Sequence, residues 1–499
     1  MKIAGLDIGT TGCKCTVFDE NGKYLDRSYR DYPVRRELSG HEINAGTVLK
    51  EVYSAVLEMA RKYPDIAGLG VTSFGETFIL ADENGEALAP SMLYTDPRGT
   101  EECGRLADSL GEKEIARITG LRPHTIYSIG KLVWMKEHRP EIFERARYIF
   151  LMEDFVVYHL TGERNIDYSL ASRTMAFDIH TLSFSDEILK TAGIDKALFS
   201  HPVPTGTIAG EVTASAAERC GLKQGTKVVS ISHDQVAAAV GAGAFNAETA
   251  VDGAGTVECL TPIYDRMPDT DAMYQGYFSV VPYVKSGTYV AYAFSYAGGA
   301  LIQWCIDGFA GGFLRKAKER DISVNTLLEE EYRKKHGDEP SGLLVLPHIT
   351  GAATPYMDNG SRGAVLGLSA GTTVIELYRG CMEGVAYEMY LNLQALKDTG
   401  VHFKKLHATG GGARSGEWMQ IKADVLDLPI TALKTSDAGT VGSAMLTGVA
   451  LGVFKDLPDA AAHMVEEMET YEPRRAMHEK YMAIYTRYKE VYNAVRPLV

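Results

Sequence analysis

The 499-residue sequence lacks any apolar run long enough to cross a membrane. A spanning helix needs about 20 consecutive apolar residues. The longest uncharged apolar stretches here, Val236–Phe245 and Thr440–Phe454, are shorter and rich in small residues. An acidic residue, Asp7, lies close to the first methionine, and no small-residue cleavage site follows an apolar run, which argues against a secretory signal. We therefore expect a cytoplasmic protein that does not bind membranes.

The sequence also lacks an excess of positive charge and a disulfide pattern. Lys and Arg number 51 against 65 Asp and Glu, and the resulting net charge of −14 disfavours nucleic acid as a partner. The seven cysteines are odd in number and scattered, so no disulfide framework is expected. Cys13 and Cys15 have no second Cys or His pair at zinc-site spacing. We interpret them as small residues on one face of a strand.

Short apolar strands and amphipathic helices alternate along the chain, which is typical of an α/β protein. The pattern predicts strands at 2–8 and 13–18 and helices over Thr47–Arg61 and Lys131–His138. A second group of strands starts near residue 226.

Two similar turns lie about half a chain apart and suggest two related halves. Asp7–Gly12 separates two strands, and Asp252–Thr256 lies in a second strand–turn–strand pattern. We place an N-terminal domain at 1–247 and a C-terminal domain at 248–499.

The first of these turns, Asp7-Ile8-Gly9-Thr10-Thr11-Gly12, has the composition of a phosphate-binding loop. Glycines allow successive backbone N–H groups to converge on an anion. The hydroxyls of Thr10 and Thr11 add donors, and Lys14 adds a positive charge. Asp7, at the end of a strand, would hold magnesium directly or through water. The alternative is an ordinary hairpin turn with an exposed aspartate.

A second candidate is Ser232-His233-Asp234-Gln235, which follows an apolar strand and precedes a run of small residues. Sheets of α/β proteins place their ligands at such strand ends, where Asp234 would accept a proton from a substrate hydroxyl. The alternative is a helix N-cap, a common role of aspartate. Glu76, which lies between Gly75 and Thr77, is either a ligand of sugar hydroxyls or a solvated turn residue.

A third candidate is the glycine run Gly410-Gly411-Gly412-Ala413-Arg414-Ser415, between a short strand and a helix. Three glycines allow the backbone to approach a flat or phosphorylated ligand closely, and the alternative is a flexible loop. The run is not G-x-G-x-x-G, and the chain has no G-x-x-x-x-G-K-[ST], which weakens dinucleotide-binding and P-loop interpretations.

Taken in order, these stretches resemble the FGGY family of carbohydrate kinases over nearly the whole chain. Tyr94-Thr95-Asp96-Pro97-Arg98 is similar to the family's W-x-D-x-R motif, and Lys131–Trp134 and Arg362–Leu368 to its two signature stretches. The run from Gly410 to Gln420 resembles its nucleotide segment. The resemblance implies ATP-dependent phosphorylation of a sugar or polyol hydroxyl. It also implies an α/β fold of two actin-like (ribonuclease H-like) ATPase domains that flank a catalytic cleft.

The resemblance further implies roles for individual residues. Asp234 matches the family's catalytic base and Asp7 the acid near magnesium, so these two carboxylates are the expected metal-associated residues. The expected ATP-binding residues are Thr10, Thr11 and Lys14 in the first turn, Gly255 and Thr256 in the second, Gly299 and Gln303 on a helix, and Gly411, Gly412 and Ser415 in the glycine run. The expected substrate-binding residues are Gly75, Glu76, His233, Asp234 and Gln235.

The substrate stays open within ketoses, such as pentuloses and hexuloses, aldoses and polyols. His233-Asp234 resembles a pair in rhamnulose and fuculose kinases, whereas Asp234-Gln235 and Glu76-Thr77 are similar to glycerol kinases. Gly75 replaces the arginine that precedes the glutamate there, which removes a bidentate donor for hydroxyls. The alternatives are a kinase of a non-sugar hydroxyl compound and a non-catalytic actin-like ATP-binding switch. The family resemblance also suggests a homodimer.

Overall fold

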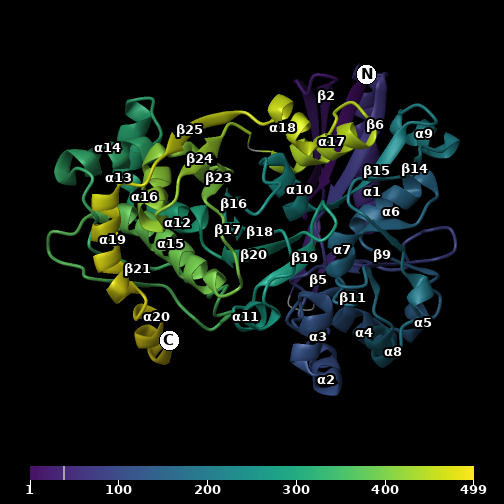
Figure 1. Cartoon of the computed structure of the whole chain (residues 1–499), viewed down its shortest axis with the longest axis horizontal. Coiled ribbons are helices and arrows are strands. Elements are labelled where there is room, and N and C mark those ends of the chain that lie inside the picture. The colour runs from purple at the N-terminus through teal and green to yellow at the C-terminus, as the bar shows by residue number, and fades with distance from the viewer. Residues whose placement is uncertain (38–39, 436) are drawn as a thin grey trace.

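The computed structural model describes residues 1–37, 40–435 and 437–499 (Figure 1). The first half of the chain forms the right-hand part of the molecule in this view, and most of the second half forms the left-hand part. Two late helices, α17 (Ala438–Ala450) and α18 (Leu457–Met464), instead lie beside the N-terminal sheet. Within the described ranges, no helix is long and apolar enough to span a membrane.

Six strands form the N-terminal sheet, in the order β14-β15-β6-β1-β2-β3. β1, β2 and β3 are antiparallel neighbours, whereas β6 and β15 continue the sheet parallel to β1. The strands are β1 (Lys2–Ile8), β2 (Gly12–Asp19), β3 (Tyr24–Asp31), β6 (Ile66–Ser73), β14 (Thr207–Glu211) and β15 (Lys227–His233). The two strands expected at the start of the chain are confirmed. Cys13 and Cys15 are buried on β2, two residues apart and therefore on one face.

The C-terminal sheet repeats this pattern of pairing. Its order is β18-β20-β17-β16-β23-β24-β25, with β19 also paired to β20. β16, β17 and β20 are antiparallel neighbours, and β23 and β24 continue parallel to β16. The strands are β16 (Thr249–Ala254), β17 (Glu258–Thr261), β18 (Ile263–Tyr264), β19 (Ser279–Pro282), β20 (Tyr289–Ser295), β23 (Lys405–Thr409), β24 (Ile430–Leu433) and β25 (Glu467–Tyr471). The shared pattern supports two related halves, and the boundary at 247/248 stays a prediction.

Helices and short strands connect these sheets and cover them. The expected helices lie within α1 (Ala45–Lys62) and α4 (Ser128–His138). The other helices are α2 (Thr100–Leu110), α3 (Glu112–Thr119), α5 (Pro140–Phe143), α6 (Met152–Thr161), α7 (Tyr168–Ser172), α8 (Asp186–Ala192), α9 (Ala214–Cys220), α10 (Asp234–Gly241), α11 (Thr270–Gln275), α12 (Gly299–Phe309), α13 (Gly311–Glu319), α14 (Val324–His336), α15 (Val374–Lys397), α16 (Gly416–Leu426), α19 (Arg475–Tyr488) and α20 (Val491–Val495). The short strands are β4 (Val34–Glu37), β5 (Gly40–Ile43), β7 (Ile79–Ala81), β8 (Ser91–Met92), β9 (Tyr148–Phe150), β10 (Asn165–Asp167), β11 (Phe177–Asp178), β12 (Ser183–Phe184), β13 (His201–Val203), β21 (Leu344–Leu346) and β22 (Ala364–Leu366).

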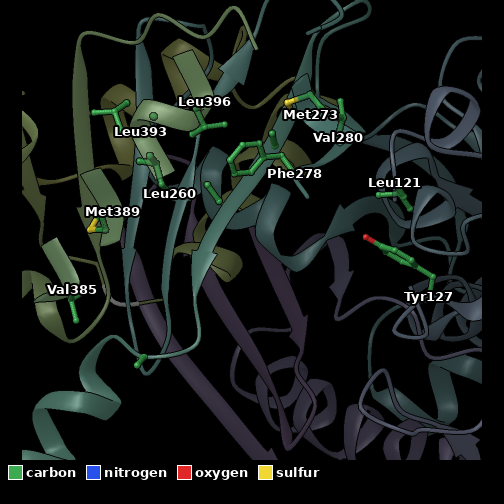
Figure 2. Close-up of a cluster of buried hydrophobic side chains, with 14 of the residues drawn as sticks. Leu121, Tyr127, Leu260, Met273, Phe278, Val280, Val385, Met389, Leu393 and Leu396 are labelled. Atoms are coloured by element: carbon green, nitrogen blue, oxygen red, sulfur yellow. The ribbon is translucent and has the colours of Figure 1, made fainter. Parts of the chain in front are cut away.

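One hydrophobic cluster joins the two halves of the molecule. Figure 2 shows Leu121 and Tyr127 of the N-terminal half on one side and Phe278 and Val280 of the C-terminal half on the other. The backbones also touch, because the N–H of Val280 donates to the carbonyl oxygen of Gly120 over 2.9 Å. Burial of apolar surface is the main favourable term in folding, so this shared core holds the halves in the arrangement that forms the site.

Helices α10 and α17 cross at two glycines. A Cβ atom at Gly241 would lie 1.9 Å from the carbonyl oxygen of Ala438, and one at Gly442 would lie 1.9 Å from that of Ala237. Glycines of the N-terminal sheet make room for α17 in the same way, because a Cβ at Gly5 would lie 2.2 Å from the carbonyl oxygen of Thr440. The missing side chains therefore allow one helix of the C-terminal half to pack directly on the N-terminal half.

The substitution Gly442→Ala is expected to lower the free energy of unfolding by about 3 kcal/mol. The added methyl group meets backbone atoms, which cannot move aside as a flexible side chain would, and overpacking of this kind costs about 1–3 kcal/mol or more. Gly308→Ala is the matched control. It adds the same atom in helix α12, where no other atom lies within 4 Å, and helix propensity predicts a gain of up to about 1 kcal/mol. Denaturant unfolding measures both, and equal midpoints would contradict the crossing.

Candidate active site

Three acidic residues lie at one edge of the N-terminal sheet. β1, β6 and β15 are parallel neighbours, so the carboxyl ends of these strands lie together, where α/β sheets place ligands. Asp7 is near the end of β1, Glu76 follows β6, and Asp234 comes directly after β15. The charges of Asp7 and Glu76 both raise the pKa of Asp234. The structure therefore brings together the three acids that the sequence singled out separately.

The Asp234 carboxyl has a pKa raised to about 8. Burial is the largest cause, followed by repulsion from Asp7 and Glu76, while the backbone N–H of Gln235 opposes the shift. The side chain is still 30% exposed, so a ligand can reach it. His233 is the N-cap of α10 and Asp234 is its first residue, so the N-cap alternative for Asp234 is wrong.

His233 contacts Asp234 from the adjacent position. Its Nε2 lies 3.2 Å from Oδ1 of Asp234. Burial holds the pKa of the His233 imidazole well below its usual range, so the ring is neutral. Gln235 is exposed beside this pair and contributes its backbone N–H to the carboxylate.

Asp7 lies against the C-terminal half of the chain. Burial raises its pKa to about 6, and the nearby charge of Lys14 opposes that shift. A Cβ atom at Gly439 of α17 would lie 2.9 Å from Oδ2 of Asp7, so this position leaves space for the carboxylate. Lys14 lies directly across from Asp7 on β2, and its Nζ is 2.9 Å from Oδ1 of Asp437, just before α17. The first turn thus contacts both halves.

Glu76 is held by Arg173, a residue that follows α7. The Nε atom of Arg173 donates to Oε1 of Glu76 over 2.7 Å, and Nη2 donates to the same oxygen. Both side chains are 8% exposed. Glu76 has a φ of +64°, an unusual value for a residue other than glycine, and strain of this kind concentrates at functional sites. A Cβ at Gly75 would lie 2.9 Å from Cγ of Arg173, so the glycine gives the arginine its space.

The second turn occupies the matching place in the C-terminal half. Gly255 and Thr256 lie between β16 and β17, as Thr10 and Thr11 lie between β1 and β2. Helix α12 begins on this turn, because the N–H of Gly299 donates to the carbonyl oxygen of Gly255 over 2.8 Å. Thr10 and Thr256 are accessible, and Thr11 is exposed, so both turns present backbone and hydroxyl donors.

The glycine run approaches this second turn. A Cβ at Gly410 would lie 2.6 Å from the carbonyl oxygen of Ala254, and one at Gly412 would lie 2.7 Å from the ring of Trp418. Gly411 is exposed with open space around it. The structure therefore gathers Gly255, Thr256, Gly299, Gly411 and Gly412 at one place.

Two other predicted nucleotide residues have partners within the protein. Ser415 caps α16 by accepting from the N–H of Trp418, and its hydroxyl donates to Glu329 over 2.8 Å. Gln303, on the exposed face of α12, donates to Asp307 over 2.7 Å. Gln303 thus lies on the helix that begins at the second turn, but its hydrogen bond to Asp307 does not direct the side chain toward that turn.

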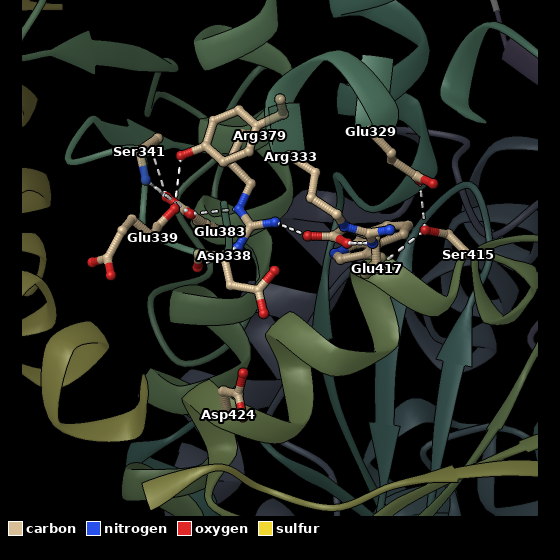
Figure 3. Close-up of polar contacts among 12 residues, drawn as sticks. Glu329, Arg333, Asp338, Glu339, Ser341, Arg379, Glu383, Ser415, Glu417 and Asp424 are labelled. Carbon is tan, nitrogen blue, oxygen red and sulfur yellow. Dashed lines mark hydrogen bonds and ion pairs between the residues drawn. The ribbon is translucent and has the colours of Figure 1, made fainter. Parts of the chain in front are cut away.

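Ion pairs on two sides of α16 hold this helix in place. Figure 3 shows Glu417 between Arg379 and Arg333, with Ser415 and Glu329 beside them. On the opposite side, Lys422 is fully buried, its Nζ lies 2.8 Å from Oδ2 of Asp252, and it also pairs with Glu258. Asp252 and Glu258 flank the second turn, so Lys422 ties α16 to that turn.

Sequence reasoning missed four residues of this site: Arg173, Lys422, Asp437 and Tyr292, whose ring lies 5.9 Å from that of His233. Only Asp437 had a usable signal, because it precedes α17 after a parallel strand, as Asp234 begins α10 after β15. The other three are recognised only through partners far away in the chain.

Comparison with known proteins agrees with this geometry. The model of the N-terminal domain of the FGGY family of carbohydrate kinases matches residues 2–241, and that of its C-terminal domain matches residues 254–451. The chain is 25% identical to the xylulose kinase of Bacillus subtilis over 99% of its own length and 97% of that protein. It is 30% identical to the glycerol kinase of Agathobacter rectalis, over 92% and 91% of the two chains. The crystal structure of a xylulose kinase from Rhodospirillum rubrum superposes with a TM-score of 0.90 at 24% identity, over 100% and 99% of the chains, which shows the shared fold.

Proposed function

The chain belongs to the FGGY family of carbohydrate kinases and catalyses ATP-dependent phosphorylation of a sugar or polyol, and we propose that Asp234 is its general base. One observation carries this assignment. Asp234 lies among three carboxylates at adjacent strand ends, its side chain is 30% exposed, and the charges of the other two both raise its pKa. Phosphoryl transfer depends mainly on positioning and charge stabilisation, and this arrangement offers both.

The role of Asp234 follows from its surroundings. A raised pKa means that the carboxylate holds a proton more strongly than usual, which suits a group that must take one from a hydroxyl near neutral pH. His233 is neutral and packs beside it, so it limits the movement of the carboxylate without competing for the proton. Asp234 would orient the attacking hydroxyl and receive its proton as the new O–P bond forms.

The nucleotide would lie between the two turns and the glycine run. The whole chain carries a charge of −14, which repels an anionic nucleotide. Backbone N–H groups of the turns and the ammonium of Lys14 would have to outweigh that field locally. The pair between Lys14 and Asp437 keeps this ammonium next to the first turn.

The carboxylates also fit a magnesium ion. The charge of Asp7 raises the pKa of Asp234, and a cation beside the two carboxylates would relieve that repulsion. Carboxylate oxygens are the ligands that Mg²⁺ prefers in proteins. Asp7 and Asp234 would hold the ion, directly or through water, and the ion would neutralise charge on the phosphates of ATP.

The acceptor is a ketose or a polyol. The curated relatives are named xylulose kinases and glycerol kinases, so their names include one ketose and one polyol. Cytoplasmic location and a homodimer stay predictions.

A substrate panel tests the proposal. ADP release is measured with ATP and Mg²⁺ across ketopentoses, ketohexoses, aldoses and polyols. Release that depends on one sugar or polyol identifies the acceptor and supports the proposal. Release that is equal with and without every acceptor would instead indicate an ATPase switch.

The pH dependence gives a second test. The value of kcat/KM for the acceptor is expected to rise with pH, to reach half of its maximum near pH 8 and to level off above that pH at low magnesium, because the base acts only when deprotonated. Higher Mg²⁺ concentrations should move this rise to lower pH, because a cation favours the carboxylate. A profile that is flat from pH 6 to 9 at every magnesium concentration would contradict the assignment of Asp234.

A further inference from the structure

Three buried polar atoms beside Asp234 have no hydrogen-bond partner among the described residues. They are Nη1 of Arg173, the hydroxyl of Tyr292 and Nδ1 of His233. Buried polar groups are almost always paired, and each exception calls for an explanation. The three residues are close together, because the rings of His233 and Tyr292 are 5.9 Å apart and Cζ of Arg173 is 5.9 Å from the ring of Tyr292.

Contacts within the protein hold the Arg173 side chain in place but leave one of its N–H groups without a hydrogen-bond partner among the described residues. Glu76 takes Nε and Nη2, and the guanidinium lies over the rings of Tyr127 and Tyr292. The orientation of Nη1 is therefore fixed, although no hydrogen-bond acceptor among the described residues pairs with it. Gly75 provides the space for this side chain. The position next to Glu76 is a glycine and supplies no guanidinium. Arg173, which follows α7, supplies one instead.

Tyr292 comes from the other half of the chain. It lies on β20, whereas Arg173 and His233 belong to the N-terminal half. Tyr292 is 6% exposed, and its hydroxyl is buried without a hydrogen-bond partner among the described residues. A ligand bound at this place would touch both halves of the molecule.

We propose that Arg173 and Tyr292 are specificity-determining residues that bind one oxygen of the acceptor, next to the hydroxyl that is phosphorylated. The inference rests on the proposed function, since it places the acceptor at Asp234. A guanidinium N–H can only donate, so its partner is an oxygen that accepts, as in a carbonyl or hydroxyl group. Glu76 already neutralises the charge of Arg173, so the guanidinium offers a hydrogen-bond donor without a net charge to attract a carboxylate. The site therefore selects a neutral polyhydroxy compound over a sugar acid.

Tyr292→Phe is the cleanest test, because it removes only an unpartnered hydroxyl. A purely structural tyrosine would lose nothing by this change. We expect KM for the acceptor found in the panel to rise about 3- to 10-fold, with KM for ATP and the melting temperature unchanged. The matched control is Tyr387→Phe, which removes another buried, unpartnered hydroxyl from helix α15, and KM should not change there.

Arg173→Lys tests the charged donor while keeping the positive charge beside Glu76. One ammonium cannot replace both the fork to Glu76 and the free donor, so KM for the acceptor should rise about 10- to 100-fold with KM for ATP unchanged. Arg122→Lys is its control, because Arg122 also stacks on tyrosine rings, Tyr274 and Tyr277, but does not contact Glu76. A sugar acid such as gluconate should be a poorer acceptor than its neutral sugar for the wild type.

The outcomes separate the two claims. If the wild type phosphorylates an acceptor and neither Tyr292→Phe nor Arg173→Lys changes KM for it, the inference is overturned and the proposed function stands. Preference for the sugar acid would also overturn it. If the wild type transfers phosphate to no acceptor, the proposed function fails, and the inference fails with it.

Discussion

Replacing Asp234 by asparagine is expected to lower kcat by about 10²–10⁴-fold, the usual contribution of a general base. Asparagine keeps the size of the side chain but cannot accept the proton of the hydroxyl. Binding of ATP, measured by calorimetry without acceptor, should be retained, because the two turns and the glycine run are untouched. Asp271→Asn, which removes an exposed carboxylate on α11, is the control and should keep wild-type kcat.

The same variant carries an independent prediction on stability. In the folded protein the pKa of Asp234 is raised from 3.8 to about 8, so the folded state binds this proton more tightly than the unfolded chain. Stability from this group is then present at low pH and is lost as the pH rises from about 4 to 8. Asp234→Asn should therefore melt at a higher temperature than the wild type at pH 8. An inactive variant that also melts lower would mean that a damaged fold, and not the missing base, explains the loss.

Replacing Lys422 by methionine is expected to lower the free energy of unfolding by about 3–5 kcal/mol. Lys422 is fully buried between Asp252 and Glu258, and removing one partner of a buried ion pair leaves uncompensated charge in the interior. Attraction to the two acids raises the pKa of Lys422 despite burial, which keeps it charged. Denaturant unfolding of the C-terminal half measures the loss.

Lys404→Met is the matched control for this change. Lys404 pairs with Glu248 over 2.7 Å, but both side chains are mostly exposed, at 74% and 64%. Exposed ion pairs contribute about 0–1 kcal/mol, so the two lysine variants should differ severalfold in their effect. If the two variants lost similar amounts of stability, the buried ammonium of Lys422 would not hold the second turn to α16.

Local patterns sufficed to predict the strand ends and the acids on them. Asp7 lies near the end of a short apolar strand and Asp234 directly follows one, and the strand's position in a parallel sheet decides where the side chain lies. The glycine run was also recognisable from its composition, and the structure accounts for it because a Cβ at Gly410 would lie 2.6 Å from the carbonyl oxygen of Ala254. These features depend on neighbours within a few residues along the chain, so they can be predicted from the sequence alone.

The remaining features depend on contacts between distant segments. Arg173 binds Glu76 across 97 residues, and Lys422 binds Asp252 across 170. Neither pair has a local motif. Gly75 was read as the loss of a guanidinium, whereas the structure fills that space with Arg173 from α7. The packing of α17 on the N-terminal sheet was equally hidden, because it depends on glycines in β1 and β6 that mark no turn.

The central claim is that this site transfers phosphate from ATP to a sugar or polyol hydroxyl with Asp234 as base. The most direct test uses ATP labelled in its γ-phosphate together with the acceptor found in the panel. The account predicts one label on the acceptor for each ADP formed, almost none in inorganic phosphate, and loss of transfer in Asp234→Asn. Label that appears as inorganic phosphate at the same rate with and without the acceptor would contradict it.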